Sequence, residues 1–331
     1  MALVFLSAPS FAQSASPTPT PQEVENGDVI SGSDALLLSV PVFVTDQKGR
    51  QATGLTAADL VVIDNGRVRD IAFFGAQARP VDIVFALDDS GSIRDVIAQQ
   101  QATALDLLRR FDQPSQMALI RFSQESRLAV PFTGELKLLR SEFARSAAGQ
   151  TRTAIFDAAL VAVKAFGDLK SNSAERRRLV ILLSDGLDTA STVKPRDVIA
   201  AAREAGVSFY VIHLPLYTVR GNSLVTRPVA KGFKDLATQT GGLYLAGPNA
   251  RAALSGPSAI DLAPVFQSIA NDINGRYDLA YYLDPSTDVK GTHHLEVRCI
   301  AKTCRDLLLR IMRPDFIWDG NVQPNGSSIT P

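Results

Sequence analysis

The sequence predicts an α/β fold, in which a doubly wound, mostly parallel sheet is flanked by helices, with a small β-sandwich beside it. Two continuous apolar runs, at 81–87 and 179–183, are typical of strands buried on both faces of a sheet. Helical patterns follow these runs, as expected where strands and helices alternate. Alternating β-type segments occupy the two ends of the chain, outside this α/β body.

The chain is long enough for this body and a second, smaller unit, since it has 331 residues of which 46% are apolar. We predict a signal-peptide remnant and Pro-rich linker at 1–34, a β segment at 35–79, the α/β domain at 80–275, a second β segment at 276–317 and a disordered tail at 318–331. The ends of a doubly wound body often lie close together, so we expect the two β segments to join in one sandwich.

The flanking β segments have simple strand and turn patterns. In the first, we expect a strand at 36–45, a short helical turn at 56–59, a strand at 60–63, a tight turn at Asp64-Asn65-Gly66 and a return strand at 67–74. In the second, we expect strands at 277–283, 293–300 and 306–312.

The α/β domain begins with the apolar run at 81–87 and an amphipathic helix after it. Further strands are expected at 117–122, 127–132 (an edge hairpin with its predecessor), 179–183, 207–213 and 243–245. Helices are expected at 136–147, at 153–166, from Pro195 to just before Gly206, at 229–240 and at 261–274. A polar insertion at 216–228 lies near the predicted binding edge, which makes it a candidate for partner selectivity.

Oxygen-bearing side chains follow the first buried strand, in the stretch Asp88-Asp89-Ser90-Gly91-Ser92. Ligands of open α/β sheets bind at the carboxyl ends of the strands. Alternating Asp88, Ser90 and Ser92 offer a carboxylate and hydroxyls there, which are hard donors suited to a small divalent cation. The alternative is an ordinary strand-to-helix corner, because Asp and Ser are also common turn and N-cap residues.

Two more loops carry suitable donors at matching places. Thr153 opens a predicted helix, and Asp185 follows the second buried strand. Hard donors from three loops therefore face one rim of the predicted sheet.

This set resembles the metal-ion-dependent adhesion site of von Willebrand factor type A domains. The family pattern is Asp-x-Ser-x-Ser on one loop, Thr on a second and Asp after a later strand. The matching residues are Asp88, Ser90, Ser92, Thr153 and Asp185, and the resemblance covers roughly residues 80 to 275. The β flanks are similar to a subgroup first catalogued from acidobacteria.

One position departs from the family pattern. The usual Gly-Gly before the Thr reads Thr151-Arg152 here, so Thr151 and Thr153 are both candidates for the ligand. We assign it to Thr153, because Ala-Ile-Phe-Asp-Ala follows it as in the family.

The resemblance implies Mg²⁺ (or Mn²⁺) held by these residues, with an Asp or Glu of a protein partner completing the coordination. It therefore implies a protein-binding or adhesion module and no enzyme. A structural or assembly module with an incidental metal is the alternative. A Mg²⁺-dependent phosphohydrolase would want a second carboxylate where Ser90 stands, and no phosphate-binding Gly-x-x-x-x-Gly-Lys or Gly-x-Ser-x-Gly motif occurs.

Several other polar residues have ordinary expected roles. We expect Asp89 to face solvent or cap a helix, Asp157 to act as a helix-end residue, and Asp188 to be a supporting or loop-capping group. His213, at the end of an apolar strand, is expected to be a near-core histidine. Lys and Arg total 34, as do Asp and Glu, so no nucleic-acid partner is expected.

The amino terminus resembles an export signal. Ala2 to Leu6 form a short apolar core and Ser10-Phe11-Ala12 a small-x-small cleavage signature, but no Lys or Arg precedes Lys48. We expect the positively charged start to lie upstream of Met1, and the protein to be secreted, periplasmic or at the cell surface. No apolar stretch reaches the roughly 18 residues of a transmembrane segment.

Cys299 and Cys304 have a spacing compatible with a disulfide across a β-hairpin turn, which an exported protein favours. Two reduced, half-buried thiols are the alternative.

Overall fold

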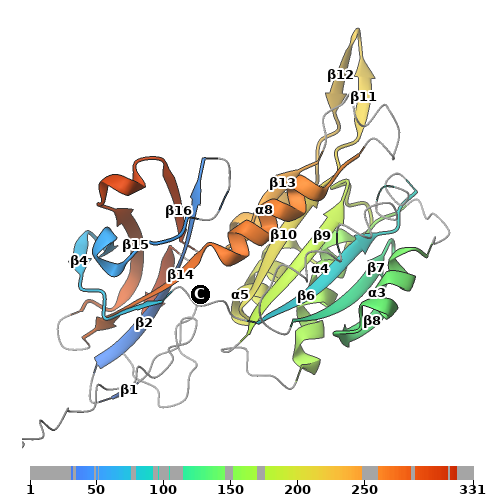
Figure 1. Cartoon of the computed structure of the whole chain (residues 1–331). Coiled ribbons are helices and arrows are strands. Elements are labelled where there is room, and N and C mark those ends of the chain that lie inside the picture. Colours follow the sequence, from blue (N-terminus) through green and yellow to red (C-terminus); the bar gives the residue numbers. More distant parts are fainter. Residues whose placement is uncertain are drawn as a thin grey trace, which may run out of the picture.

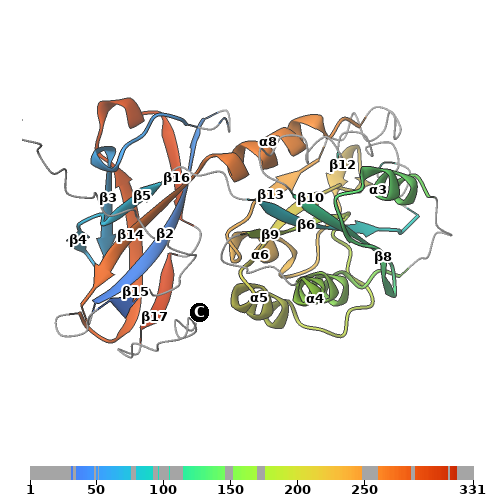
Figure 2. The ribbon, with the colours of Figure 1, turned by 60° about the horizontal axis from the view of Figure 1, so that its bottom comes forward.

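The protein is described by a computed structural model over residues 31–32, 35–47, 50, 52–75, 80–91, 96, 104, 115–145, 152–169, 176–247, 260–284, 288–311 and 314–318. An α/β body and an all-β body lie side by side (Figures 1 and 2). The predicted remnant and linker at 1–34, except Ser31 and Gly32, and the tail from 319 onward lie outside the described residues.

The central sheet of the α/β body has the order β13-β10-β9-β6-β7-β8. Its strands are β6 (Val81–Asp88), β7 (Gln116–Phe122), β8 (Ser126–Thr133), β9 (Arg177–Ser184), β10 (Val207–His213) and β13 (Tyr244–Ala246). All neighbours are parallel except β7 and β8, which form the predicted edge hairpin. Every residue of β6 is buried, which explains its continuous apolar sequence.

Helices cover both faces of this sheet. On one face lie α3 (Leu136–Phe143) and α8 (Ala263–Asn274), and on the other α4 (Ile155–Ala165), α5 (Pro195–Glu204) and α6 (Phe233–Thr238). A short 3-10 turn, η3 (Phe166–Asp168), ends α4. The helix predicted at 229–240 begins only at Phe233, because Gly232 has a left-handed backbone (φ 89°) in which a helix cannot continue.

The all-β body is a sandwich built from both flanks of the chain. One sheet contains β1 (Ser31–Gly32), β2 (Ala35–Asp46), β5 (Phe73–Gly75), β14 (Arg276–Leu283) and β16 (Leu307–Ile311). The other contains β3 (Leu60–Asp64), β4 (Arg67–Arg69), β15 (Gly291–Cys299) and β17 (Asp315–Trp318). Apolar residues of both sheets form one buried cluster between them.

The single return strand predicted at 67–74 is wrong. The chain leaves β4, which pairs with β3, and crosses to the opposite sheet, where β5 pairs with β14. The sequence around Asp70 has no turn signal strong enough to reveal this crossing. The edge strand β17 was also not predicted.

The two bodies meet where α8 passes into β14. The Arg310 guanidinium of β16 lies 2.6 Å from the Asp272 carboxylate of α8, which also accepts a hydrogen bond from the Tyr210 hydroxyl at 2.7 Å. The backbone N–H of Val44 donates to the carbonyl of Gly275 at 3.0 Å. Buried charges are thus paired across this junction.

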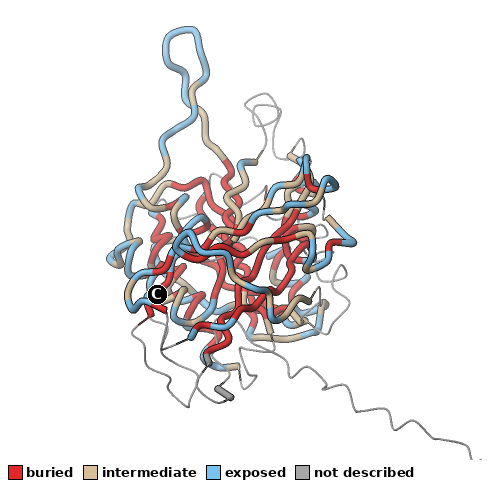
Figure 3. The backbone as a smooth tube through the Cα atoms, turned by 90° about the vertical axis from the view of Figure 1, so that its left-hand side faces the viewer, coloured by how far each residue is buried: buried red, intermediate tan, exposed pale blue. Residues whose placement is uncertain are grey.

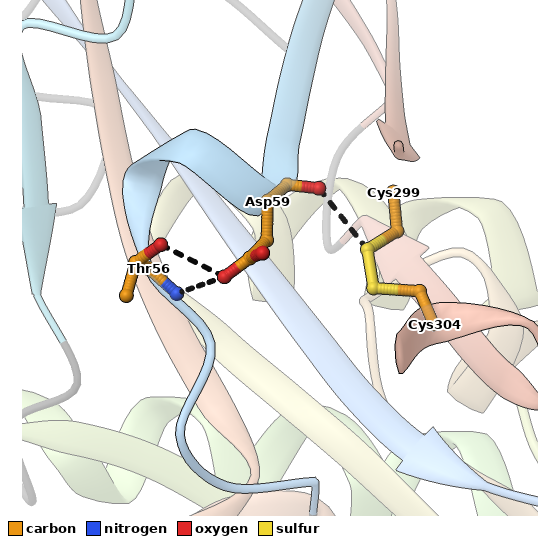
Figure 4. Close-up of a disulfide and its surroundings, with 4 residues drawn as sticks. All are labelled: Thr56, Asp59, Cys299 and Cys304. Atoms are coloured by element: carbon orange, nitrogen blue, oxygen red, sulfur yellow. Dashed lines mark hydrogen bonds between the residues drawn. A yellow bond between two sulfur atoms is a disulfide. The ribbon is translucent and has the colours of Figure 1, made fainter. Parts of the chain in front are cut away.

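The Cys299–Cys304 pair forms a disulfide, with 5.9 Å between the Cα atoms (Figure 4). The expected hairpin is wrong, because β15 and β16 belong to opposite sheets and η5 (Lys302–Cys304) lies between them. The Cys299 sulfur lies 3.1 Å from the carbonyl oxygen of Asp59, which ends the short helical turn η1 (Ala57–Asp59). The disulfide therefore closes the end of the sandwich where the chain changes sheets.

Replacing Cys299 and Cys304 together by Ser should lower the free energy of unfolding by about 2 kcal/mol, as expected for a short closed loop. Urea denaturation under oxidising conditions measures this change. The wild type in reductant should match the double variant. A variant as stable as the oxidised wild type would contradict the expectation.

Candidate metal centre

Asp88 lies at the carboxyl end of β6 and is fully buried. Its carboxylate accepts a hydrogen bond from the Ser184 hydroxyl at 2.7 Å and another from the backbone N–H of Ser90 at 2.9 Å. Ser184 is the last residue of β9, which pairs in parallel with β6. The two neighbouring strands thus fix the Asp88 side chain at their shared edge.

The Asp88 carboxylate has no ion pair with a described Lys, Arg or His, in contrast to five buried aspartates elsewhere in the fold. Asp64, Asp82, Asp272, Asp278 and Asp288 each have a cationic partner, namely Arg69, Arg176, Arg310, Arg276 and Arg69 again. A buried carboxylate without a cation is costly. Burial raises the pKa of Asp88 to about 6, and the nearby negative charge of Asp185 adds to the increase, whereas its hydrogen bonds oppose it.

Asp185 follows β9 directly and is also buried. One of its carboxylate oxygens accepts the backbone N–H of Leu187 at 2.9 Å. Gly186 turns the chain there with φ 79°, and a Cβ on it would lie 2.7 Å from a methyl group of Val229. The tight turn therefore holds Asp185 near Asp88.

Thr153 is buried at the start of α4 and connects two loops of the rim. Its carbonyl accepts the backbone N–H groups of Thr189 and Ala190, at 2.8 and 3.0 Å, and its own N–H donates to the Thr189 hydroxyl at 2.9 Å. The next residue, Ala154, donates to the carbonyl of Ser123 at the end of β7, at 2.7 Å. Thr153 is thus fixed between the ends of β7 and β9.

Ser90 is buried next to Asp88, in the Asx-type turn formed by its N–H bond to the Asp88 carboxylate. Ser92 and the alternative ligand Thr151 lie outside the described residues. The structure therefore brings Asp88, Ser90, Thr153 and Asp185 to one edge of the sheet.

The supporting aspartates Asp188 and Asp157 lie where they are expected. Asp188 caps α4 through the N–H of Ile155 at 2.8 Å, within the expected role. Asp157 lies in the first turn of α4, as expected, and it also accepts the N–H groups of Thr192 and Val193, at 2.9 and 2.8 Å, because the loop after β9 folds over α4.

The expectation that Asp89 faces solvent is wrong, because buried Arg121 of β7 donates to its carboxylate at 2.8 Å. The start of the helix that Asp89 could cap lies outside the described residues. Arg121 was missed, although an arginine within an otherwise apolar strand is a signal that a buried partner is needed.

His213 is buried at the end of β10, as expected, and its Nδ1 lies 2.6 Å from the Tyr244 hydroxyl. Burial lowers its pKa, so the ring is neutral at pH 7.

The donor set fits a small, hard divalent cation. Carboxylates and hydroxyls are the oxygen donors that Mg²⁺ and Mn²⁺ accept. In the described part of the chain, no three His, Cys, Asp or Glu side chains gather as a metal-binding group. A site built mainly from hydroxyls does not need such a group.

We predict that Asp88→Asn raises the unfolding temperature of the metal-free protein at pH 7.5. Since the folded pKa of about 6 exceeds the ordinary 3.8, the contribution of Asp88 to stability is present below pH 3.8 and lost as the pH rises through 6. Asparagine removes the buried charge, so it should raise the free energy of unfolding by about 1–3 kcal/mol at pH 7.5. The gain should shrink towards pH 4.

Thermal unfolding in EDTA at both pH values checks this. Asp278→Asn is the matched control, because it removes a carboxylate that is ion-paired with Arg276 and should destabilise at pH 7.5. Equal destabilisation by Asp88→Asn at both pH values would contradict the expectation.

Comparison with known proteins agrees with the fold of the α/β body. A family model described as von Willebrand factor type A domain matches residues 82–237. No curated protein matches the chain.

Among solved structures, the chain is similar to the conserved hypothetical protein BatB from Bacteroides thetaiotaomicron, with 19% identity, TM-score 0.40 and coverage of 54% of this chain and 96% of that one. It is also similar to proximal thread matrix protein 1 from the mussel byssus with a zinc-occupied MIDAS motif, with 15% identity, TM-score 0.47 and coverage of 64% of this chain and 50% of that one. These similarities are too low to support any argument about the site. The family match covers residues 82–237, just under half of the chain, so this part of the α/β body is similar to the von Willebrand factor type A domain.

Proposed function

We propose that the domain binds a divalent cation, Mg²⁺ or Mn²⁺, and through it a carboxylate of a protein partner. The ligands are Asp88, Ser90, Ser92, Thr153 and Asp185, directly or through water. The observation that carries the proposal is the buried Asp88 carboxylate, which has no cationic partner among the described residues, whereas five buried aspartates elsewhere in the fold have one. A bound cation would supply the missing charge.

The same donor set favours binding of a carboxylate from another protein. A cation bound at the candidate metal centre would keep an open coordination position and a positive charge. Because most of the ligands are neutral hydroxyls, Asp88 and Asp185 alone balance the charge of the ion from the protein side. The rim then attracts an Asp or Glu side chain from another protein.

Burial of Asp88 supports a binding role over hydrolysis. A nucleophilic carboxylate must reach the phosphorus of its substrate, whereas Asp88 is 0% exposed and is held by Ser184 and Ser90. Ser90 also occupies the position where a phosphatase of this kind would want a second carboxylate.

We place the protein outside the cytoplasm. The Cys299–Cys304 disulfide supports an oxidising compartment, and the amino-terminal sequence resembles an export signal. Within the described ranges, none of the helices has the length and apolar character needed to cross a membrane.

Saturating Mg²⁺ or Mn²⁺ should raise the unfolding temperature of the wild type, since a ligand at a hundredfold its Kd adds about 2.7 kcal/mol. Ser90→Ala and Thr153→Ala should remove most of this gain. Ser268→Ala, on α8, is the matched control and should keep it. Calorimetric titration with each metal measures the affinity, and unchanged affinity in the two site variants would contradict the ligand assignment.

Binding of a peptide with a central Asp should be lost in EDTA and in Asp88→Ala, and also when the peptide Asp is replaced by Asn. Fluorescence anisotropy measures all three losses. Equal affinity with and without EDTA would sink the metal-mediated mechanism. Turnover of a generic phosphoester, abolished by Asp88→Asn, would instead favour the hydrolase.

A further inference from the structure

A β-hairpin projects from the edge of the sheet that carries the candidate metal centre (Figures 1 and 3). Its strands are β11 (Tyr217–Arg220) and β12 (Ser223–Thr226), within the polar insertion at 216–228. It follows β10, which pairs with β9 in parallel so that His213 lies opposite Ser184. Parallel strands end at the same edge, so the hairpin rises beside the loop of Asp185.

Hydrogen bonds fix the base of the hairpin to the site. The backbone N–H of Leu214 donates to the carbonyl of Ser184 at 2.9 Å, and that of Ala230 donates to the carbonyl of Gly186 at 2.8 Å. Ser184 and Gly186 flank Asp185. Both ends of the insertion therefore join the loop that presents this carboxylate, so the hairpin is held in place relative to the site.

One face of the hairpin exposes large apolar side chains. The register places Val219 opposite Leu224, and these side chains are 73% and 39% exposed. Within the described part of the chain, β11 and β12 pair only with each other. A two-stranded ribbon without packing is marginally stable, and an exposed apolar face on it is typical of an interaction surface.

The insertion and its return to α6 are also basic. Residues 214–234 include Arg220, Arg227, Lys231 and Lys234 but no Asp or Glu. Arg220, Arg227 and Lys231 are exposed, and none of them has an ion pair with a described residue. A fourth exposed cation, Arg152, directly precedes Thr153 and donates to the carbonyl of Thr189 at 3.4 Å. We call these four residues (Arg152, Arg220, Arg227 and Lys231) the basic rim.

We propose that the basic rim and the apolar face of the hairpin select an extended, acidic segment of the partner protein. This inference rests on the proposed function: one carboxylate of the segment binds the metal, and its flanking acidic residues meet the basic rim. A bound divalent cation would balance the charges of Asp88 and Asp185, so the cations of the basic rim would be left to attract acidic residues of the segment. Each leg of the hairpin has 4 residues and so extends about 13 Å, a distance that about four residues of an extended peptide span.

The test uses the full chain with Mg²⁺ and synthetic peptides of about nine residues, each with a central Asp flanked by Glu, Gln or Lys. Anisotropy at low salt should show the Glu-flanked peptide binding about tenfold more tightly than the Gln-flanked one, with the Lys-flanked peptide weakest. Arg220→Glu combined with Arg227→Glu should abolish or invert this order. Arg196→Glu, at an exposed position of α5, is the matched control and should preserve it.

Each outcome separates this inference from the proposed function. If the charge-reversed variant keeps the wild-type order of affinities, or if the wild type shows no preference among the flanking residues, the basic rim does not select the partner.

Vesicles of phosphatidylcholine with about one quarter phosphatidylglycerol test whether the hairpin binds a membrane instead. Hairpin-dependent binding to these vesicles without a peptide preference would also overturn the inference. Peptide binding that needs neither Mg²⁺ nor the central Asp would contradict the proposed function. The order of affinities of the Glu-, Gln- and Lys-flanked peptides would still decide whether the basic rim selects the partner.

Discussion

The hydrogen bond between the Ser184 hydroxyl and the Asp88 carboxylate is the contact on which the rest of the binding edge depends. It joins the ends of β6 and β9 and holds a carboxylate inside the protein, where water cannot solvate it. Such a group needs a positive charge from another source. The neighbouring loops bring Asp185, Thr153 and Ser90 to the same edge of the sheet, which is the basis of the proposal that a cation binds there.

The loops around this point hold their shape mainly through hydrogen bonds between backbone and side chain. Thr153 is tied to Thr189 and, through Ala154, to Ser123, while Asp157 and Asp188 bind the N–H groups of neighbouring segments. These groups belong to loops that would otherwise be free to move. Preorganisation of this kind lets hydroxyls act as ligands, because their positions are set before a cation arrives.

The sequence predicts the strands of the α/β body well, because β6 and β9 are buried on both faces and their apolar runs have no competing interpretation. Candidate site residues could be proposed because each follows such a strand or opens a helix. Contacts between distant residues could not be predicted. Nothing local reveals that Asp89 meets Arg121, or that Ser184 bonds to Asp88, since both depend on which strands become neighbours. The same limit explains the missed crossing between β4 and β5, because sheet membership is decided by partners far along the chain.

The position of the sandwich relative to the sheet has a further consequence. The chain enters the α/β body at Val81, the first residue of β6, and leaves it at Gly275, so both crossings lie at the amino ends of the parallel strands. The edge that carries the candidate metal centre is at the opposite pole. Attachment of the sandwich to a cell envelope or to another module would therefore leave that pole facing outward, where even a bulky partner could dock without obstruction.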